Sequence, residues 1–170
     1  MTRDREFHMY RKPQASFWGF VLYVTIAALV VLADQWLKLL VTERFALGEF
    51  VYVTAFFNLC HVRNTGAAFS FLSGAGGWQM LFFTAVAVLV CLGIVVMLWR
   101  HNKKTLFSLS LALIMGGAVG NLIDRLTLAA VVDFLDFHWA GYHWPAFNLA
   151  DIAICAGAFG VIMNELFQKR

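Results

Sequence analysis

The sequence is dominated by four apolar stretches, each of them long enough to cross a lipid bilayer as a helix. They cover residues 17–41, 78–99, 106–123 and 147–167. The hydrocarbon core of a bilayer is about 30 Å thick and a helix rises about 1.5 Å per residue, so roughly 20 apolar residues cross it. Only 14% of the 170 residues are charged, whereas about a quarter is usual in a soluble domain. We therefore expect an all-α membrane protein that forms a single domain over residues 1–170.

Basic residues are divided unevenly between the two ends of these helices. One end carries Arg3, Arg5, Arg11, Lys12, Arg100, Lys103, Lys104, Lys169 and Arg170, and the other carries Lys38, Arg44, Arg63 and Arg125. Because cytoplasmic segments of membrane proteins are enriched in Lys and Arg, we expect both termini to be cytoplasmic. Residues 42–77 and 124–146 would then form two loops on the outer side.

The first outer loop has a composition typical of β-structure. Residues 49–71 are rich in Val, Phe, Tyr and Thr, and Asn64-Thr65-Gly66 is a turn signal. We expect a small antiparallel sheet at the membrane surface, on the extracytoplasmic side.

Several familiar kinds of site have no support in the sequence. Cys60, Cys91 and Cys155 form no CxxC pair, which argues against a disulfide framework or a zinc site. His138 and His143 flank a loop near Asp136, but no metal-binding spacing such as HExxH is present. The basic residues lie between apolar stretches and not in any nucleic-acid-binding module. We expect no metal, no organic cofactor and no nucleic-acid partner.

Ionisable side chains in membrane helices are costly unless they face protein or water, so they are candidates for function. Asp34 and Lys38 lie four residues apart near the end of the first apolar stretch, on one helix face. They could form an interfacial ion pair whose side chains reach toward water. Alternatively, they could support a site at the outer surface.

The third apolar stretch ends in a second polar group. Gly116 and Gly120 form a GxxxG step, which allows another helix to approach closely. Asn121, Asp124 and Arg125 follow at positions that share one helix face. Helix packing with a surface ion pair would explain these residues, and so would a functional site.

The fourth apolar stretch opens with Asn148 and Asp151, which have the spacing of an N-cap and an N3 residue. This spacing predicts a capping box. Capping does not exclude catalysis, because the positive end of a helix dipole stabilises a carboxylate there. Asp151 is therefore the better candidate for the ionised member of a carboxylate pair.

The segment VVDFLDF contains Asp133 and Asp136. If the segment is extended, Asp133 shares a face with Val131 and Leu135, and desolvation by such neighbours would raise its pKa. We expect Asp136, on the opposite face, to be a solvated loop residue. A helical segment would blur this distinction between the two aspartates.

Two carboxylates in different environments can act as one acid and one base. The outer loop between Asp133 and Asp151 could fold the two together, so that the charged one activates water and the neutral one polarises a scissile carbonyl. The spacing of the two residues permits this arrangement but does not establish it.

Together these motifs resemble those of the lipoprotein signal peptidase (signal peptidase II) family. They are DQWLK at 34–38, RNTGAAFS at 63–70, GGAVGNLIDR at 116–125, VVDF at 131–134 and FNLAD at 147–151. The resemblance implies four transmembrane helices with a small extracytoplasmic sheet. It also implies that Asp133 and Asp151 are catalytic. Substrate binding or support of the site is implied for Asp34, Asn64, Asn121, Asp124, Arg125 and Asn148.

The resemblance further implies the substrate and the location. The substrate would be a prolipoprotein whose cysteine carries a diacylglyceryl group, cleaved just before that cysteine without a metal or cofactor. The enzyme would be a multi-pass protein of the bacterial cytoplasmic (inner) membrane, surrounded by lipid, with its active site on the periplasmic side. We expect it to act as a monomer.

Two other functions remain open at this point. A transporter or proton-coupled channel would also carry intramembrane aspartates, but near the middle of the membrane. Here the candidates lie at the outer ends of the predicted helices, which favours surface chemistry; they are Asp34, Asp124, Asp133, Asp136 and Asp151. A non-catalytic membrane assembly factor would use the same polar motifs for helix packing alone.

Overall fold

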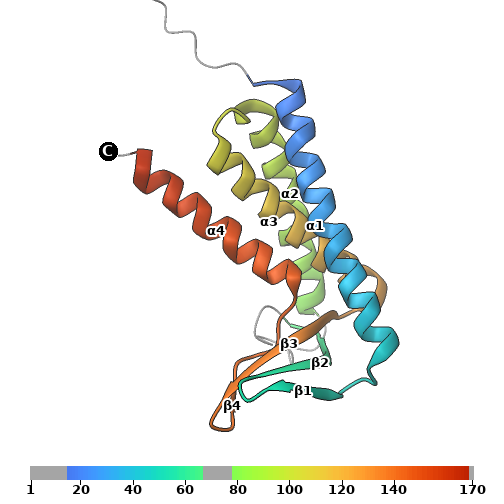
Figure 1. Ribbon diagram of the computed structural model, residues 1–170. Coiled ribbons are helices and arrows are strands. Elements are labelled where there is room, and N and C mark those ends of the chain that lie inside the picture. Colours follow the sequence, from blue (N-terminus) through green and yellow to red (C-terminus); the bar gives the residue numbers. More distant parts are fainter. Residues whose placement is uncertain (1–14, 67–77, 169–170) are drawn as a thin grey trace, which may run out of the picture.

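Four long helices form the body of the protein (Figure 1). A computed structural model describes residues 15–66 and 78–168. The helices are α1 (Phe17–Arg44), α2 (Trp78–His101), α3 (Thr105–Leu128) and α4 (Leu149–Gln168). Each contains a stretch long and apolar enough to cross a membrane, so the predicted multi-pass membrane fold is confirmed. Helix α3 continues past residue 123, which makes Asp124 and Arg125 helical and not part of a loop.

A four-stranded sheet lies at one end of the helices (Figure 1). Its strands are β1 (Phe50–Thr54), β2 (Phe57–Asn64), β3 (Val131–Trp139) and β4 (Tyr142–His143), in the order β1-β2-β3-β4. All three pairings are antiparallel. The predicted small sheet is thus confirmed, and its third and fourth strands lie within the second predicted loop, residues 124–146. Residues 67–70 of the RNTGAAFS motif lie outside the described residues.

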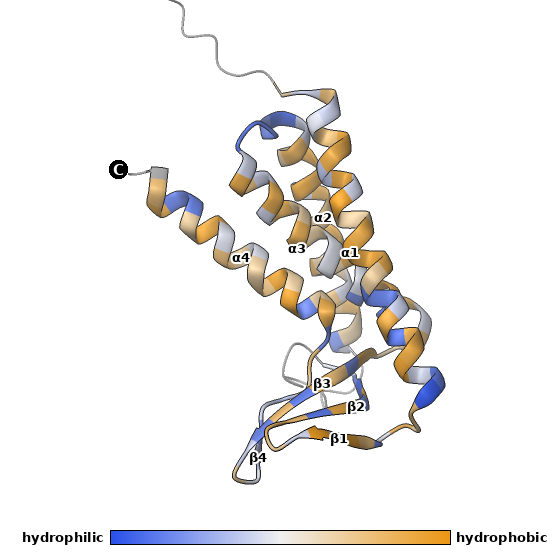
Figure 2. Ribbon diagram, viewed as in Figure 1, coloured by the Kyte–Doolittle hydropathy of each residue, from blue (hydrophilic) through white to orange (hydrophobic). Residues whose placement is uncertain are grey.

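The start of α1, the α2–α3 connection and the end of α4 lie at the opposite end from the sheet (Figure 1). Apolar residues cover most of each helix, while hydrophilic residues gather in the α2–α3 connection and where the helices approach the sheet (Figure 2). Much of the predicted charge asymmetry rests on residues outside the described part of the chain: Arg3, Arg5, Arg11, Lys12, Lys169 and Arg170. The start of α1 and the end of α4, which lead to the two termini, nevertheless lie at the same end of the helices (Figure 1).

Glycines on α3 allow two neighbouring helices to pack closely against it. A Cβ atom at Gly116 would lie 2.8 Å from the carbonyl oxygen of Ala27 in α1. A Cβ atom at Gly117 would overlap the carbonyl oxygen of Ala150 in α4. The predicted GxxxG packing is therefore present, and it faces α1. The first turn of α4 packs against α3 at a different glycine, Gly117.

The expectation that Asp136 is a solvated loop residue is wrong. Strand β3 is extended, as one alternative supposed, but the Asp136 residue is only 2% exposed. The side-chain amide of Asn58 donates to Asp136 Oδ2 at 2.8 Å, and His143 Nδ1 lies 2.8 Å from Oδ1. Strands on both sides of β3 supply these partners, which the local sequence pattern does not reveal.

Candidate active site

Asp133 lies on β3 where the sheet meets the helices, and it is 2% exposed. The side-chain amide of Asn64 on β2 donates to its Oδ2 at 3.1 Å, and that of Asn148 donates to its Oδ1 at 2.7 Å. Burial, and then the nearby charge of Asp151, raise the pKa of Asp133 to about 7, although both amide hydrogen bonds act to lower it. Asp133 can therefore carry a proton near neutral pH.

Asp151 lies in the first turn of α4 and forms a reciprocal cap with Asn148. The backbone N–H of Asp151 donates to Asn148 Oδ1 at 2.9 Å, and the backbone N–H of Asn148 donates to Asp151 Oδ2 at 3.3 Å. The predicted capping box is confirmed. The positive end of the α4 dipole makes this a favourable position for a negative charge.

Asn148 connects the two aspartates. This residue is fully buried. Its side-chain nitrogen donates to Asp133. Its side-chain oxygen accepts from the backbone N–H of Asp151, and its own backbone N–H donates to the Asp151 carboxylate. The first turn of α4 is thereby fixed to β3, which precedes it in the chain. The arrangement places one carboxylate on the sheet and one at a helix N-terminus around a single asparagine.

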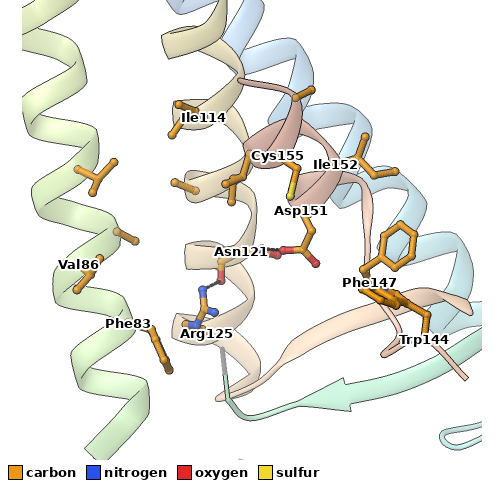
Figure 3. A pocket seen from close by; sticks show the side chains of 15 residues that line it. Phe83, Val86, Ile114, Asn121, Arg125, Trp144, Phe147, Asp151, Ile152 and Cys155 are labelled. Atoms are coloured by element: carbon orange, nitrogen blue, oxygen red, sulfur yellow. Dashed lines mark hydrogen bonds between the residues drawn. The ribbon is translucent and has the colours of Figure 1, made fainter. Parts of the chain in front are cut away.

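Asn121 on α3 also contacts Asp151, and a buried lysine fixes its orientation. Lys38 Nζ donates to Asn121 Oδ1 at 2.9 Å, so the amide nitrogen of Asn121 points the other way. That nitrogen donates to Asp151 Oδ1 at 2.8 Å (Figure 3). Asp151 therefore accepts hydrogen bonds from two asparagine residues, one on α3 and one at the start of its own helix.

Lys38 belongs to a buried charge cluster that joins α1 to α3. Its Nζ atom lies 2.8 Å from Asp34 Oδ2 and 2.9 Å from Asp124 Oδ2, and all three side chains are at most 4% exposed. Asp34 also accepts the backbone N–H of Ala150 in α4 at 2.9 Å, and Asp124 accepts that of Val132 in β3 at 3.0 Å. The pair of Asp34 and Lys38 therefore does not reach toward water. Through Asp34 the cluster holds α4, which carries Asp151, and through Asp124 it holds β3, which carries Asp133.

Arg125 lies one turn beyond Asn121 on α3, and its Nη1 donates to the carbonyl oxygen of Asn121 at 3.3 Å. Its guanidinium carbon is 5.6 Å from the centre of the Phe83 ring on α2. Every predicted site residue thus belongs to one connected group of side chains, built from α1, α3, α4 and the sheet.

A cavity of about 690 Å³ opens beside this group, between α2, α3 and α4 (Figure 3). Asp151, Asn121 and Arg125 supply its polar and charged side chains, and the rest of its wall is predominantly apolar. The carboxylate of Asp151 therefore lies in the wall of a predominantly apolar cavity.

The sequence motifs did not single out two parts of this site. Gln35 donates to Asp124 Oδ1 at 2.8 Å and to the carbonyl oxygen of Gly120 at 3.1 Å; its place within DQWLK was the available signal. The cavity wall includes Phe83 and Ile114, which look like ordinary lipid-facing residues in the sequence. Among residues 15–66 and 78–168, no group of three or more His, Cys, Asp or Glu side chains is arranged to hold a metal.

The fold and the site together define a multi-pass membrane protein with a buried carboxylate network next to an apolar cavity. Comparison with known proteins then identifies its family. The model of signal peptidase (SPase) II matches residues 26–167, and the chain belongs to this family of proteases. Family membership favours an enzyme over a transporter or a non-catalytic assembly factor.

Curated relatives and solved structures agree with this assignment. The lipoprotein signal peptidase of Ralstonia nicotianae is 52% identical over 148 residues, which is 87% of this chain and 86% of the relative. That of Cupriavidus necator is 51% identical over 150 residues, with 88% and 86% covered. A bacterial membrane enzyme solved at 2.3 Å by the in meso method is 30% identical, has a TM-score of 0.79 and shares 92% coverage of both chains.

Proposed function

We propose that this protein is an aspartic endopeptidase that removes the signal peptide from prolipoproteins. Cleavage takes place just before a cysteine that carries a diacylglyceryl group, and Asp133 and Asp151 are the catalytic residues. The observation that carries the proposal is the bridge from Asp133 through Asn148 to Asp151 in a chain of the signal peptidase II family. We propose that the enzyme acts as a monomer.

In this mechanism the two aspartates have different protonation states. Asp151, held at the N-terminus of α4, is ionised and takes a proton from a water molecule. The resulting hydroxide attacks the scissile carbonyl carbon while protonated Asp133 donates its proton to the carbonyl oxygen. When the tetrahedral intermediate collapses, Asp151 returns its proton to the leaving amine and Asp133 recovers its own from the hydroxyl group. The reaction consumes one water molecule and needs no metal or cofactor.

Asn64, Asn148 and Asn121 hold the carboxylates in position for these steps, because each donates a hydrogen bond to Asp133 or Asp151. Asp34, Asp124 and Lys38 fix the helices behind them. Arg125 lines the cavity and is available to the substrate backbone. Side chains that stay in one geometry through the reaction avoid the cost of reorganisation.

The apolar cavity supports a lipid-modified substrate. A diacylglyceryl cysteine could leave its acyl chains in the bilayer while its peptide bond approaches the carboxylates. The excess of Lys and Arg at the opposite end supports an active site on the periplasmic side of the bacterial inner membrane.

A cleavage assay with purified protein tests the proposal. The wild type should cleave a diacylglyceryl-modified prolipoprotein and leave the unmodified one largely intact. Asp133→Asn and Asp151→Asn should each abolish cleavage while the variants keep the thermal midpoint of a folded protein. A near-normal rate for either variant would remove that aspartate from the mechanism, and equal cleavage of both substrates would remove the lipid requirement.

A further inference from the structure

An aromatic wall borders the cavity on the side of the sheet. It consists of Trp144 and Phe147, which lie in the segment that leads from β4 into α4. Figure 3 shows these two side chains on one side of the cavity and Phe83 of α2 on the other. The proposed mechanism uses neither of the two wall residues.

Phe147 is held rigidly by β3. Its backbone N–H donates to the carbonyl oxygen of Leu135 at 3.1 Å, and its own carbonyl oxygen accepts from Leu135 at 2.9 Å and from Phe134 at 3.1 Å. Its ring stacks on that of Phe137, with the ring centres 5.9 Å apart. This half of the wall therefore has a fixed position.

Trp144 is attached less firmly to the sheet. Its backbone N–H donates to the carbonyl oxygen of Phe137 at 2.7 Å. However, Trp144 follows a strand of only two residues and is 58% exposed. A hairpin as short as the one formed by β3 and β4 is only marginally stable without further contacts. Contacts that hold β4 therefore contribute to the position of Trp144.

One contact that holds β4 is the pair of Asp136 and His143, and the His143 ring also contacts the rings of His138 and Phe50. His143 Nδ1 lies 2.8 Å from Oδ1 and 2.9 Å from Oδ2 of Asp136, which Asn58 also holds at 2.8 Å. The Asp136 side chain is 3% exposed, so water competes weakly for it. His143 immediately precedes Trp144, so an anchored imidazole restrains the backbone from which the indole projects.

We propose that Trp144 contacts the hydrocarbon part of the substrate and that the Asp136–His143 pair positions it for this contact. The inference rests on the proposed protease function, since it concerns how the substrate is held beside the carboxylates. The indole offers a large apolar surface next to a cavity whose wall is mostly aliphatic. The hydrocarbon belongs either to an acyl chain of the modified cysteine or to an apolar side chain of the signal peptide.

Steady-state cleavage of the lipid-modified substrate tests the role of Trp144. Trp144→Ala should raise KM roughly tenfold and change kcat by less than about twofold, as expected for a contact made equally in the ground state and the transition state. Trp144→Phe should restore most of the affinity. Trp139→Ala is the matched control, because Trp139 is on the same hairpin and 76% exposed but does not line the cavity; its KM should stay at the wild-type value.

The positioning role of His143 is tested by a double-mutant cycle. His143→Ala should raise KM, as Trp144→Ala does. The KM of the double variant should equal that of Trp144→Ala alone, because both changes remove the same contact between Trp144 and the substrate. Additive effects on KM would overturn the positioning role. An unchanged KM in Trp144→Ala, or an equal rise in Trp139→Ala, would overturn the contact itself.

Two series of substrates identify the hydrocarbon. One series shortens the acyl chains, and the other replaces apolar residues before the cysteine by Ala. The KM difference between wild type and Trp144→Ala should disappear in one of the two series. That series identifies which part of the substrate contacts Trp144. Persistence in both would overturn a hydrocarbon contact. A wild-type protein that cleaves no prolipoprotein would overturn the proposed function and this inference together, whereas normal cleavage with no effect at Trp144 would overturn only the inference.

Discussion

Lys38 Nζ lies 2.9 Å from Asn121 Oδ1, and this contact helps to turn the amide nitrogen of Asn121 toward Asp151. The side-chain amide of Asn148 donates to the same oxygen at 3.2 Å, so two donors fix the orientation of the Asn121 amide. A buried cation on α1 thus contributes to the hydrogen bonding of a carboxylate on α4. The predictions below follow from this network and from the helix packing that supports it.

Lys38→Met should destabilise the protein strongly. Removal of one member of a buried ion pair typically costs about 3–5 kcal/mol, and here two carboxylates, Asp34 and Asp124, would lose their counter-ion. Thermal unfolding in detergent micelles should show a lowered midpoint. The double variant Lys38→Met/Asp34→Asn should recover part of the loss, and Lys103→Met in the exposed α2–α3 connection should have no effect. A Lys38→Met protein as stable as the wild type would contradict the assigned ion pairs.

The pH dependence of cleavage should report the proton on Asp133. Its pKa is about 7, and a mechanism that needs this proton loses activity as pH rises through that value. Asn64→Ala removes a hydrogen bond that favours the charged form, so the pKa should rise and the alkaline limb of kcat/KM should move to higher pH. A limb that moves to lower pH would assign the titration to another group.

Gly117→Ala should impair both stability and cleavage. The added methyl group would overlap the carbonyl oxygen of Ala150 and push the first turn of α4 away from α3; overpacking of this kind costs about 1–3 kcal/mol. Gly93→Ala in α2 is the matched control, since a Cβ atom there meets nothing within 4 Å. Its thermal midpoint should be unchanged or slightly raised, because Ala is the better helix former. Equal effects of the two changes would refute the close approach of α4.

Orientation in the membrane can be measured with single cysteines introduced into a chain that lacks its native ones. Tyr142→Cys on β4, where the tyrosine is 84% exposed, should react with a membrane-impermeant thiol reagent added to intact spheroplasts. Lys103→Cys in the α2–α3 connection should react only after the membrane is opened. The reverse pattern would place the sheet in the cytoplasm.

The apolar stretches predicted the helices well, because a bilayer crossing demands a long run of apolar residues that few other structures need. The capping box at Asn148 and Asp151 was also predictable, since it depends on residues only three positions apart. Asp136 could not be placed this way. Its burial depends on Asn58 and His143, and Asn58 lies 78 positions away in the sequence, on a strand that pairs with β3.

The charged members of the site illustrate a second limit of sequence reasoning. The spacing of Asp34 and Lys38 predicts that they meet each other, and the structure contains that pair. Their contacts with Asp124 and Ala150 depend on how α1 packs against α3 and α4. The spacing alone was also compatible with a pair that reaches toward water, so only the tertiary packing distinguishes the two arrangements.

The buried cluster of Asp34, Lys38 and Asp124 also affects how the newly made chain enters the membrane. Helix α1 is synthesised first, so Asp34 and Lys38 reach the bilayer before the helix that carries Asp124 exists. Until α3 arrives, the lysine and its single partner are costly in lipid and favour a position near water or the insertion machinery. Assembly of α1 with α3 therefore supplies the second carboxylate of the buried lysine and removes this cost.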